Sequence, residues 1–160
     1  MVQAYVGFVI PAGSFELLSI RALFADDMQP KLSPADEDSR DLRYYQWYRR
    51  TDPTVVSGDR RLNVWEAMKD AWGIGVGVGA SVAGMGDIVN LRIFVLGIDR
   101  PEGGGFLFTG EAFLLEGTAP IAYLVLEWDG EEDQFSFLLV GHRRRCLGVA
   151  RGRAPLRDLR

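Results

Sequence analysis

Three glutamates are the best candidates for acid–base chemistry in this sequence. Glu111, Glu116 and Glu127 each lie within an apolar stretch that is typical of a β-strand. A carboxyl group that faces a buried pocket has a raised pKa and can exchange a proton near neutral pH. Alternation along antiparallel strands equally allows each glutamate to point outward into solvent. Both interpretations stay open, and no complete catalytic set accompanies them.

Other reactive side chains form no recognisable site. Glu131, Glu132 and Asp133 are adjacent, but they lie in a predicted hairpin tip, where exposure keeps carboxyl pKa values ordinary. His142 and Cys146 are four residues apart, yet the chain has no second histidine or cysteine to complete a zinc site. The sequence therefore predicts no catalytic residue, no metal and no cofactor, and it favours a non-enzymatic protein.

A glycine-rich run covers residues 73–86. Glycine occupies every second position from Gly73 to Gly79, alternating with isoleucine, valine, valine and alanine. This period of two is typical of a strand. We predict a strand with one β-branched face and one bare face, which an aromatic ring or another backbone can approach closely.

Three other interpretations of this run stay open. Gly75, Gly77 and Ala80 fit a relaxed phosphate-binding pattern, although a helix-like segment, not a strand, precedes them. Ser81 lies in an approximate nucleophile elbow that lacks the surrounding α/β pattern. Residues 71–86 are uncharged but fall short of the ~20 residues that span a bilayer, so they allow only a shallow interfacial insertion.

Charge is distributed unevenly along the chain. Residues 1–141 carry 11 basic and 21 acidic side chains, a net charge of −10, whereas residues 142–160 carry seven arginines and one aspartate, a net charge of +6. A basic tail on an acidic body is typical of polyanion binding. We predict that this tail contacts RNA, an anionic membrane or an acidic protein. The alternative is that it folds back over its own acidic body.

Two helices are predicted in the N-terminal half. The first covers residues 34–50, because Ser33 is a good N-cap and acidic side chains fill the first turn. The second covers residues 59–72, with Asp59 as its cap. An apolar stripe at helical spacing, which includes Trp65, is expected to pack this second helix on a sheet.

Arginines and one tryptophan are the predicted partner-binding residues. Four of them share a stripe on the first helix, where they can stack on a nucleic-acid base or dock a protein. The alternative is that the stripe only anchors the helix to the sheet. The predicted partner-binding residues are Arg40, Arg43, Trp47, Arg50, Arg143, Arg144, Arg145, Arg151 and Arg153.

The remaining segments predict β-structure. Residues 2–10 form a strand that ends in a turn, and residues 15–24 are either a helix or the second strand of a hairpin, which the short connection favours. Residues 26–33 are predicted to be a loop. Residues 88–141 contain closely spaced strands and turns, which predict one antiparallel meander.

Together these elements predict an α+β fold, an antiparallel meander of about five to seven strands with both helices packed on it. Residues 1–150 are expected to be one domain and residues 151–160 a basic tail. The predicted function is interaction or assembly through an aromatic-rich β surface and the arginine tail, with self-association possible. The alternative is a ligand-binding domain or enzyme with a pocket between the 59–72 helix and the sheet; this element order looks like hotdog or cystatin-like architectures.

Location is inferred from what the sequence lacks. A single cysteine, Cys146, excludes an internal disulfide and fits a reducing compartment. The first ten residues lack the pattern of a signal peptide, and no stretch is long enough for a transmembrane helix. We therefore expect a cytoplasmic protein.

Overall fold

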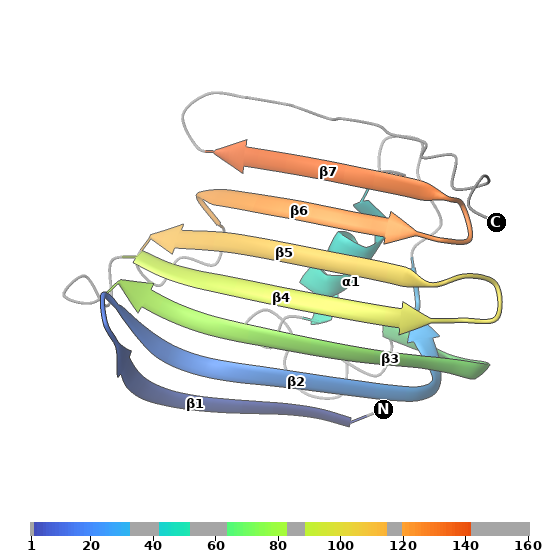
Figure 1. Cartoon of the computed structure of the whole chain (residues 1–160), viewed down its shortest axis with the longest axis horizontal. Coiled ribbons are helices and arrows are strands. Elements are labelled where there is room, and N and C mark those ends of the chain that lie inside the picture. Colours follow the sequence, from blue (N-terminus) through green and yellow to red (C-terminus); the bar gives the residue numbers. More distant parts are fainter. Residues whose placement is uncertain (1, 33–41, 52–63, 83–88, 115–119, 142–160) are drawn as a thin grey trace, which may run out of the picture.

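The fold is one continuous antiparallel sheet with a short helix on one side. The computed structural model describes residues 2–32, 42–51, 64–82, 89–114 and 120–141. Seven strands pair in the order in which they occur in the chain, so every connection joins neighbours (Figure 1). Such a meander needs no crossover connection.

The strands differ in length, and the longest are β2 and β3. The helix α1 lies behind β4, β5 and β6 in Figure 1 and contacts β5 and β6. The elements are β1 (Val2–Ala12), β2 (Phe15–Pro30), α1 (Arg43–Thr51), β3 (Trp65–Val82), β4 (Val89–Asp99), β5 (Gly105–Leu114), β6 (Ala122–Asp129) and β7 (Gln134–Gly141).

The expected α+β fold, with two helices packed on a meander, is wrong in the number of helices. The described residues contain a single nine-residue helix, not two helices packed on a meander. The predicted first helix, residues 34–50, overlaps α1, while residues 34–41 lie outside the described part of the chain. The antiparallel meander itself is confirmed, and β1, β2 and β3 extend it beyond the predicted residues 88–141.

The predicted second helix is a strand. Residues 65–72 open β3, and residues 59–63 lie outside the described part of the chain. Trp72 pairs with Asp26 of β2 on one side and with Asp99 of β4 on the other. Residues 65–67 pair with β2 alone, and only from Trp72 onward does β3 also pair with β4. This strand pairing outweighs the helix-forming residues of the segment, because local propensity differs by less than about 1 kcal/mol per residue.

The first hairpin resolves the other ambiguous segment. β1 pairs with β2, so residues 15–24 form the second strand of a hairpin, as the short connection predicted. Gly13 has a φ of 68° in the turn, a conformation that glycine adopts without strain. The predicted loop at residues 26–33 is wrong for its first half, because β2 continues to Pro30 past an irregularity at Asp27.

The glycine strand is built as the sequence predicts. The glycines of β3 point toward α1, and their β-branched neighbours point to the opposite side. The ring of Phe94 covers the bare face: a Cβ added at Gly75 would lie 2.9 Å from Phe94 Cζ, and one at Gly77 would lie 3.1 Å from Phe94 Cδ2. The absence of side chains on this face therefore leaves the room that the ring of Phe94 occupies.

Valine at position 77 should therefore destabilise the protein. We expect Gly77→Val to lower the free energy of unfolding by roughly 1–3 kcal/mol through overpacking. Gly97→Val is the matched control, because a Cβ at Gly97 meets no atom within 4 Å. Urea unfolding measures both variants, and equal losses of stability would contradict this packing argument.

The core lies between α1 and the side of the sheet that it covers, which we call the helix face. The aromatic side chains of α1 supply much of it: Trp47 is fully buried, its Nε1 donates to the Val64 carbonyl over 2.8 Å, and its ring meets that of Trp65 edge-on. Tyr48 stacks on Phe94 with ring centroids 4.8 Å apart. A short helix is thus held mainly by its aromatic contacts with the strands.

Candidate functional site

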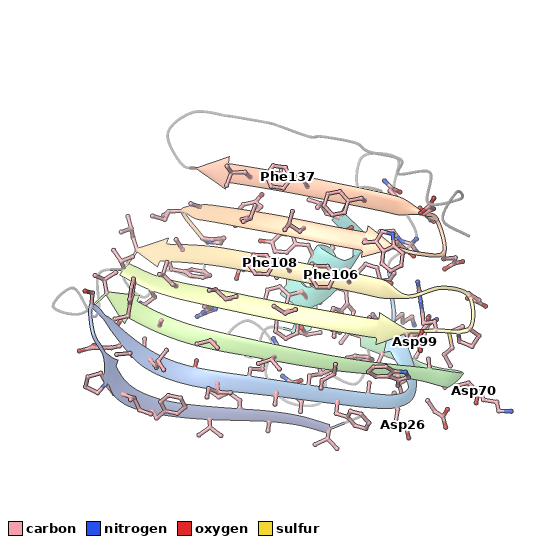
Figure 2. The ribbon with its side chains drawn as sticks, in the orientation of Figure 1. Asp26, Asp70, Asp99, Phe106, Phe108 and Phe137 are labelled. Carbon is pink, nitrogen blue, oxygen red and sulfur yellow. The ribbon has the colours of Figure 1, made fainter. Side chains whose placement is uncertain are left out.

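The side of the sheet opposite α1 is apolar almost throughout, and we call it the open face. Strand register places its side chains, since partners in register share one face. Figure 2 shows this face toward the viewer, with Phe106, Phe108 and Phe137 on it. Its principal side chains are Val2, Val6, Ile20, Phe24, Trp72, Ile74, Val76, Val78, Ile93, Val95, Phe106, Phe108, Leu114, Leu124, Leu126, Trp128, Phe135, Phe137 and Leu139.

The open face is exposed in the single chain. Ile74 is 52% exposed and Val76 is 49% exposed, although they lie in the middle of a strand that is paired on both sides. Seven strands spaced about 4.8 Å apart and about 30 Å long give this face an area of roughly 1,000 Å². The largest apolar patches of ordinary monomers reach about 300–600 Å², so the open face has the dimensions of an interaction surface.

Acidic side chains border one end of this surface. Asp26, Asp70 and Asp99 lie at one edge of the sheet, where β2 and β4 approach their last residues and β3 begins (Figure 2). Trp72 links the border to the apolar part, because its Nε1 donates a hydrogen bond of 3.1 Å to Asp99 Oδ2. Negative charge therefore lies beside the apolar surface without interrupting it.

Two of the three candidate glutamates lie on the helix face, where Glu111 is opposite Tyr123 and Glu127 is opposite Leu107. Glu111 Oε1 accepts a hydrogen bond of 2.9 Å from the Tyr45 hydroxyl and pairs with Arg49 Nη1 at 3.2 Å. Glu127 Oε2 accepts a hydrogen bond of 3.1 Å from the backbone N–H of Tyr45. Both carboxyl groups therefore bind α1 to the sheet. Glu116 lies outside the described residues.

The surroundings of Glu127 change its acidity. Burial raises its pKa from 4.5 to about 7, and the nearby Asp129 adds to the rise. Hydrogen bonds from the backbone N–H groups of Tyr45, Arg43 and Tyr44 oppose the shift, because they favour the carboxylate. Burial and the adjacent Glu111 carboxylate likewise raise the pKa of the Tyr45 phenol.

Stability should therefore depend on pH through Glu127. Its pKa is higher in the folded protein, so between pH 4.5 and about 7 the folded state holds a proton that the unfolded chain has lost. This contribution is fully present below the unfolded pKa and is lost as pH rises through about 7. Relative to Glu127→Gln, the wild type should lose up to roughly 3 kcal/mol between about pH 5 and pH 8.

Urea unfolding at matched protein concentrations measures this difference. Glutamine keeps an oxygen that can accept the N–H of Tyr45, so Glu127→Gln should remove the titration while retaining the contact. Parallel pH profiles for the two proteins would contradict the assignment of the raised pKa to Glu127.

The carboxylates of Glu111 and Glu127 do not form a substrate site. The space beside Glu127 has a volume of about 10 Å³, between Arg43, Asp129 and Glu132, which is room for about one water molecule. α1 covers the position that a substrate would need. Within the described part of the chain, no three acidic, histidine or cysteine side chains are arranged to bind a metal ion.

The predicted partner-binding stripe does not form one exposed surface. Arg43 pairs with Glu132 at 2.9 Å, and Arg50 donates to the Lys31 carbonyl over 2.9 Å. Trp47, between them in sequence, has no exposed surface and belongs to the core. Lying outside the described residues are Arg40, Arg143, Arg144, Arg145, Arg151 and Arg153.

The sequence did contain a signal for the open face. Apolar side chains occupy both parities of several strands, as in Val89–Asp99, where Ile93 and Val95 alternate with the buried Phe94 and Leu96. In a sheet with one face in water, every second residue of a strand would be polar. Apolar residues at both parities distinguish this sheet from one with a solvated polar face.

Neither a membrane-spanning helix nor a similar known protein assigns a function to this chain. Among the described helical residues, none form a helix that is long and apolar enough to cross a membrane. No protein-family model matches the chain, and no curated protein or solved structure is significantly similar to it. The function must therefore be argued from the two faces of the sheet.

Proposed function

We propose that this protein is a non-enzymatic assembly protein that associates through the open face with the open face of a second copy. The observation that carries the proposal is the apolar character of this face across all seven strands. Two such sheets would pack about 10 Å apart with interdigitating side chains, as in a β-sandwich.

The area of the open face suits a stable dimer. Pairing two faces of roughly 1,000 Å² would remove about 2,000 Å² from water, while stable protein interfaces typically bury about 1,200–2,000 Å². A two-fold axis lets the same surface serve both partners, so a nearly uncharged apolar face is complementary to itself. Both faces of the sheet would then be covered, which fits the apolar side chains that both faces carry.

The acidic border favours a protein partner over a lipid surface. Asp26 and Asp99 would approach the headgroups if the open face entered a membrane, whereas Asp70 is paired with Lys69 at 4.0 Å. Anionic lipids would repel these carboxylates, and adsorbed surfaces of this kind usually carry basic side chains instead. In a face-to-face dimer the border can remain at the rim, in contact with water.

Sedimentation velocity over a range of protein concentrations tests this proposal. Association should produce a species of twice the 17.8 kDa chain mass, and its fraction should grow with concentration. A single 17.8 kDa species up to roughly 0.1 mM would contradict the proposal, since stable interfaces of this size typically have a Kd well below that concentration.

The arginine-rich tail is a second part of the proposal. We infer that residues 1–150 are one domain and that residues 151–160 engage an acidic protein or another polyanion, on the basis of charge alone. A cytoplasmic, reducing setting is consistent with the single cysteine.

Removing residues 151–160 should weaken polyanion binding without unfolding the sheet, because the last described strand ends at Gly141. Fluorescence anisotropy with labelled RNA, measured at several salt concentrations, should show a smaller salt slope after truncation. Absence of polyanion binding by the full chain even at low salt, or equal salt slopes with and without these residues, would contradict a binding role for this tail.

A further inference from the structure

A cavity lies on the helix face, on the side of the sheet away from the proposed dimer contact. Its volume is about 60 Å³, and it is partly open to solvent. Strands β1, β2, β3 and β4 line it together with Tyr48 of α1. Because the cavity and the open face are on opposite sides of the sheet, a ligand in the cavity would not compete with a second copy.

The glycines of β3 create this cavity. Gly77 and Gly79 line its floor, where any larger residue would place a side chain. A Cβ at Gly77 would lie 3.3 Å from the Ile93 carbonyl oxygen, and a Cβ at Gly79 would collide with the Ser19 hydroxyl. The bare strand thus leaves a hollow beside the ring of Phe94, which covers Gly75 and Gly77.

Two arginines line the cavity. Arg21 and Arg92 are part of its lining, and the described residues that line it include no carboxylate. Arg21 is 6% exposed, its Nη2 donates to Thr51 Oγ1 over 3.1 Å, and its guanidinium lies 4.9 Å from the ring centre of Phe94. A guanidinium that is fixed before a ligand arrives loses little conformational entropy on binding.

The second arginine is positioned in a similar way. The Arg92 guanidinium lies 4.5 Å from the ring centre of Phe113, on the neighbouring strand β5. The remaining lining offers hydroxyl groups of Ser19 and Tyr5 as well as aromatic surface. Two cations, neutral hydroxyl donors and aromatic rings are the groups that recognise an acidic group joined to an apolar body.

We propose that this cavity binds the acidic group of a small organic anion, a carboxylate or a phosphate ester. The acidic group would lie between Arg21 and Arg92, above the backbone of Gly77 and Gly79. The apolar part of the ligand would lie against the aromatic rings of the lining and extend through the open side, because the cavity holds little more than the acidic group.

Nuclear magnetic resonance of the full chain tests the proposal with simple probes. Benzoate and phenyl phosphate should cause saturable shifts of the Gly77 and Gly79 amide signals, with a Kd below about 10 mM for at least one of them. Benzamide has the shape of benzoate without its charge, and it should bind at least about tenfold more weakly, as expected when a charge-assisted hydrogen bond is lost.

An arginine variant adds an independent test. Arg92→Gln should weaken benzoate or phenyl phosphate binding by about tenfold or more. Arg50→Gln is the matched control, since Arg50 donates to the Lys31 carbonyl and does not line the cavity; it should leave the affinity within about twofold.

Three results would overturn the proposal. They are the absence of saturable shifts at Gly77 and Gly79 with both anions, equal affinity for benzamide and benzoate, or unchanged affinity in a folded Arg92→Gln protein. The comparison of benzamide with benzoate uses the unmodified chain, so it decides the question even if the arginine variant does not fold.

Discussion

Replacing Trp65 by alanine should lower the free energy of unfolding by about 3–5 kcal/mol, as is typical of a buried aromatic side chain. Trp65 is 6% exposed, and its ring lies 5.0 Å from that of Trp47 in an edge-on contact. Truncation would remove this contact and leave a cavity where α1 meets the sheet. Urea unfolding at a fixed protein concentration measures the loss.

Lys69→Ala is the control in the same strand. The Lys69 side chain is 88% exposed, so its removal should change stability by less than about 0.5 kcal/mol. A loss below about 0.5 kcal/mol for Trp65→Ala as well would show that this tryptophan is not part of the core.

Placing a lysine in the middle of the open face should abolish self-association. Val95 lies in β4, the fourth of seven strands, between Val76 of β3 and Phe108 of β5. In a face-to-face dimer, Val95→Lys would bury an unpaired charge in both copies, which costs several kcal/mol. We expect the dimer dissociation constant to rise by about 100-fold or more, measured by sedimentation velocity.

The fold of the single chain should survive this change, because Val95 is 37% exposed there. Circular dichroism should therefore show an unaltered sheet. Glu102→Gln is the charge-matched control, because it also raises the net charge by one: Glu102 is exposed in the turn between β4 and β5, outside the strands, and its change should leave association intact. Undiminished association of a folded Val95→Lys protein would contradict the proposed interface.

The sequence predicted local β-structure better than it predicted which segments are helical. The alternation from Gly73 to Gly79 is a short-range pattern, and it gave both the strand and its bare face correctly. The segment from Trp65 to Trp72 has helical spacing of apolar residues, but its conformation is decided by pairing with β2, which β4 joins only at Trp72. The residues of such a segment do not show which distant strands it will pair with.

The candidate site was predictable only in part. Glu111 and Glu127 were recognised as glutamates within apolar strands, but their role depends on α1 crossing above them. The spacing of residues within the strands does not predict the contact of these glutamates with Tyr45 of α1. Trp47 was predicted to face a partner and is buried instead, because Val64 and Trp65 enclose it from a region that had been assigned to another helix.

The pocket expected between the 59–72 helix and the sheet has no structural basis, since Trp65–Val82 is a strand. The open face, by contrast, follows from apolar residues at both parities of the strands. That pattern was present in the sequence, but its meaning depends on knowing that α1 covers only one side.

In the proposed assembly, the open face of one copy covers the open face of another. Intermolecular nuclear Overhauser effects in a mixture of isotope-labelled and unlabelled chains test it most directly, because they arise only between protons of different copies in contact. We predict such signals between methyl and aromatic groups of Ile74, Val76, Val95 and Phe108. An associated sample whose intermolecular signals come only from other surfaces, or a sample with none, would contradict the claim.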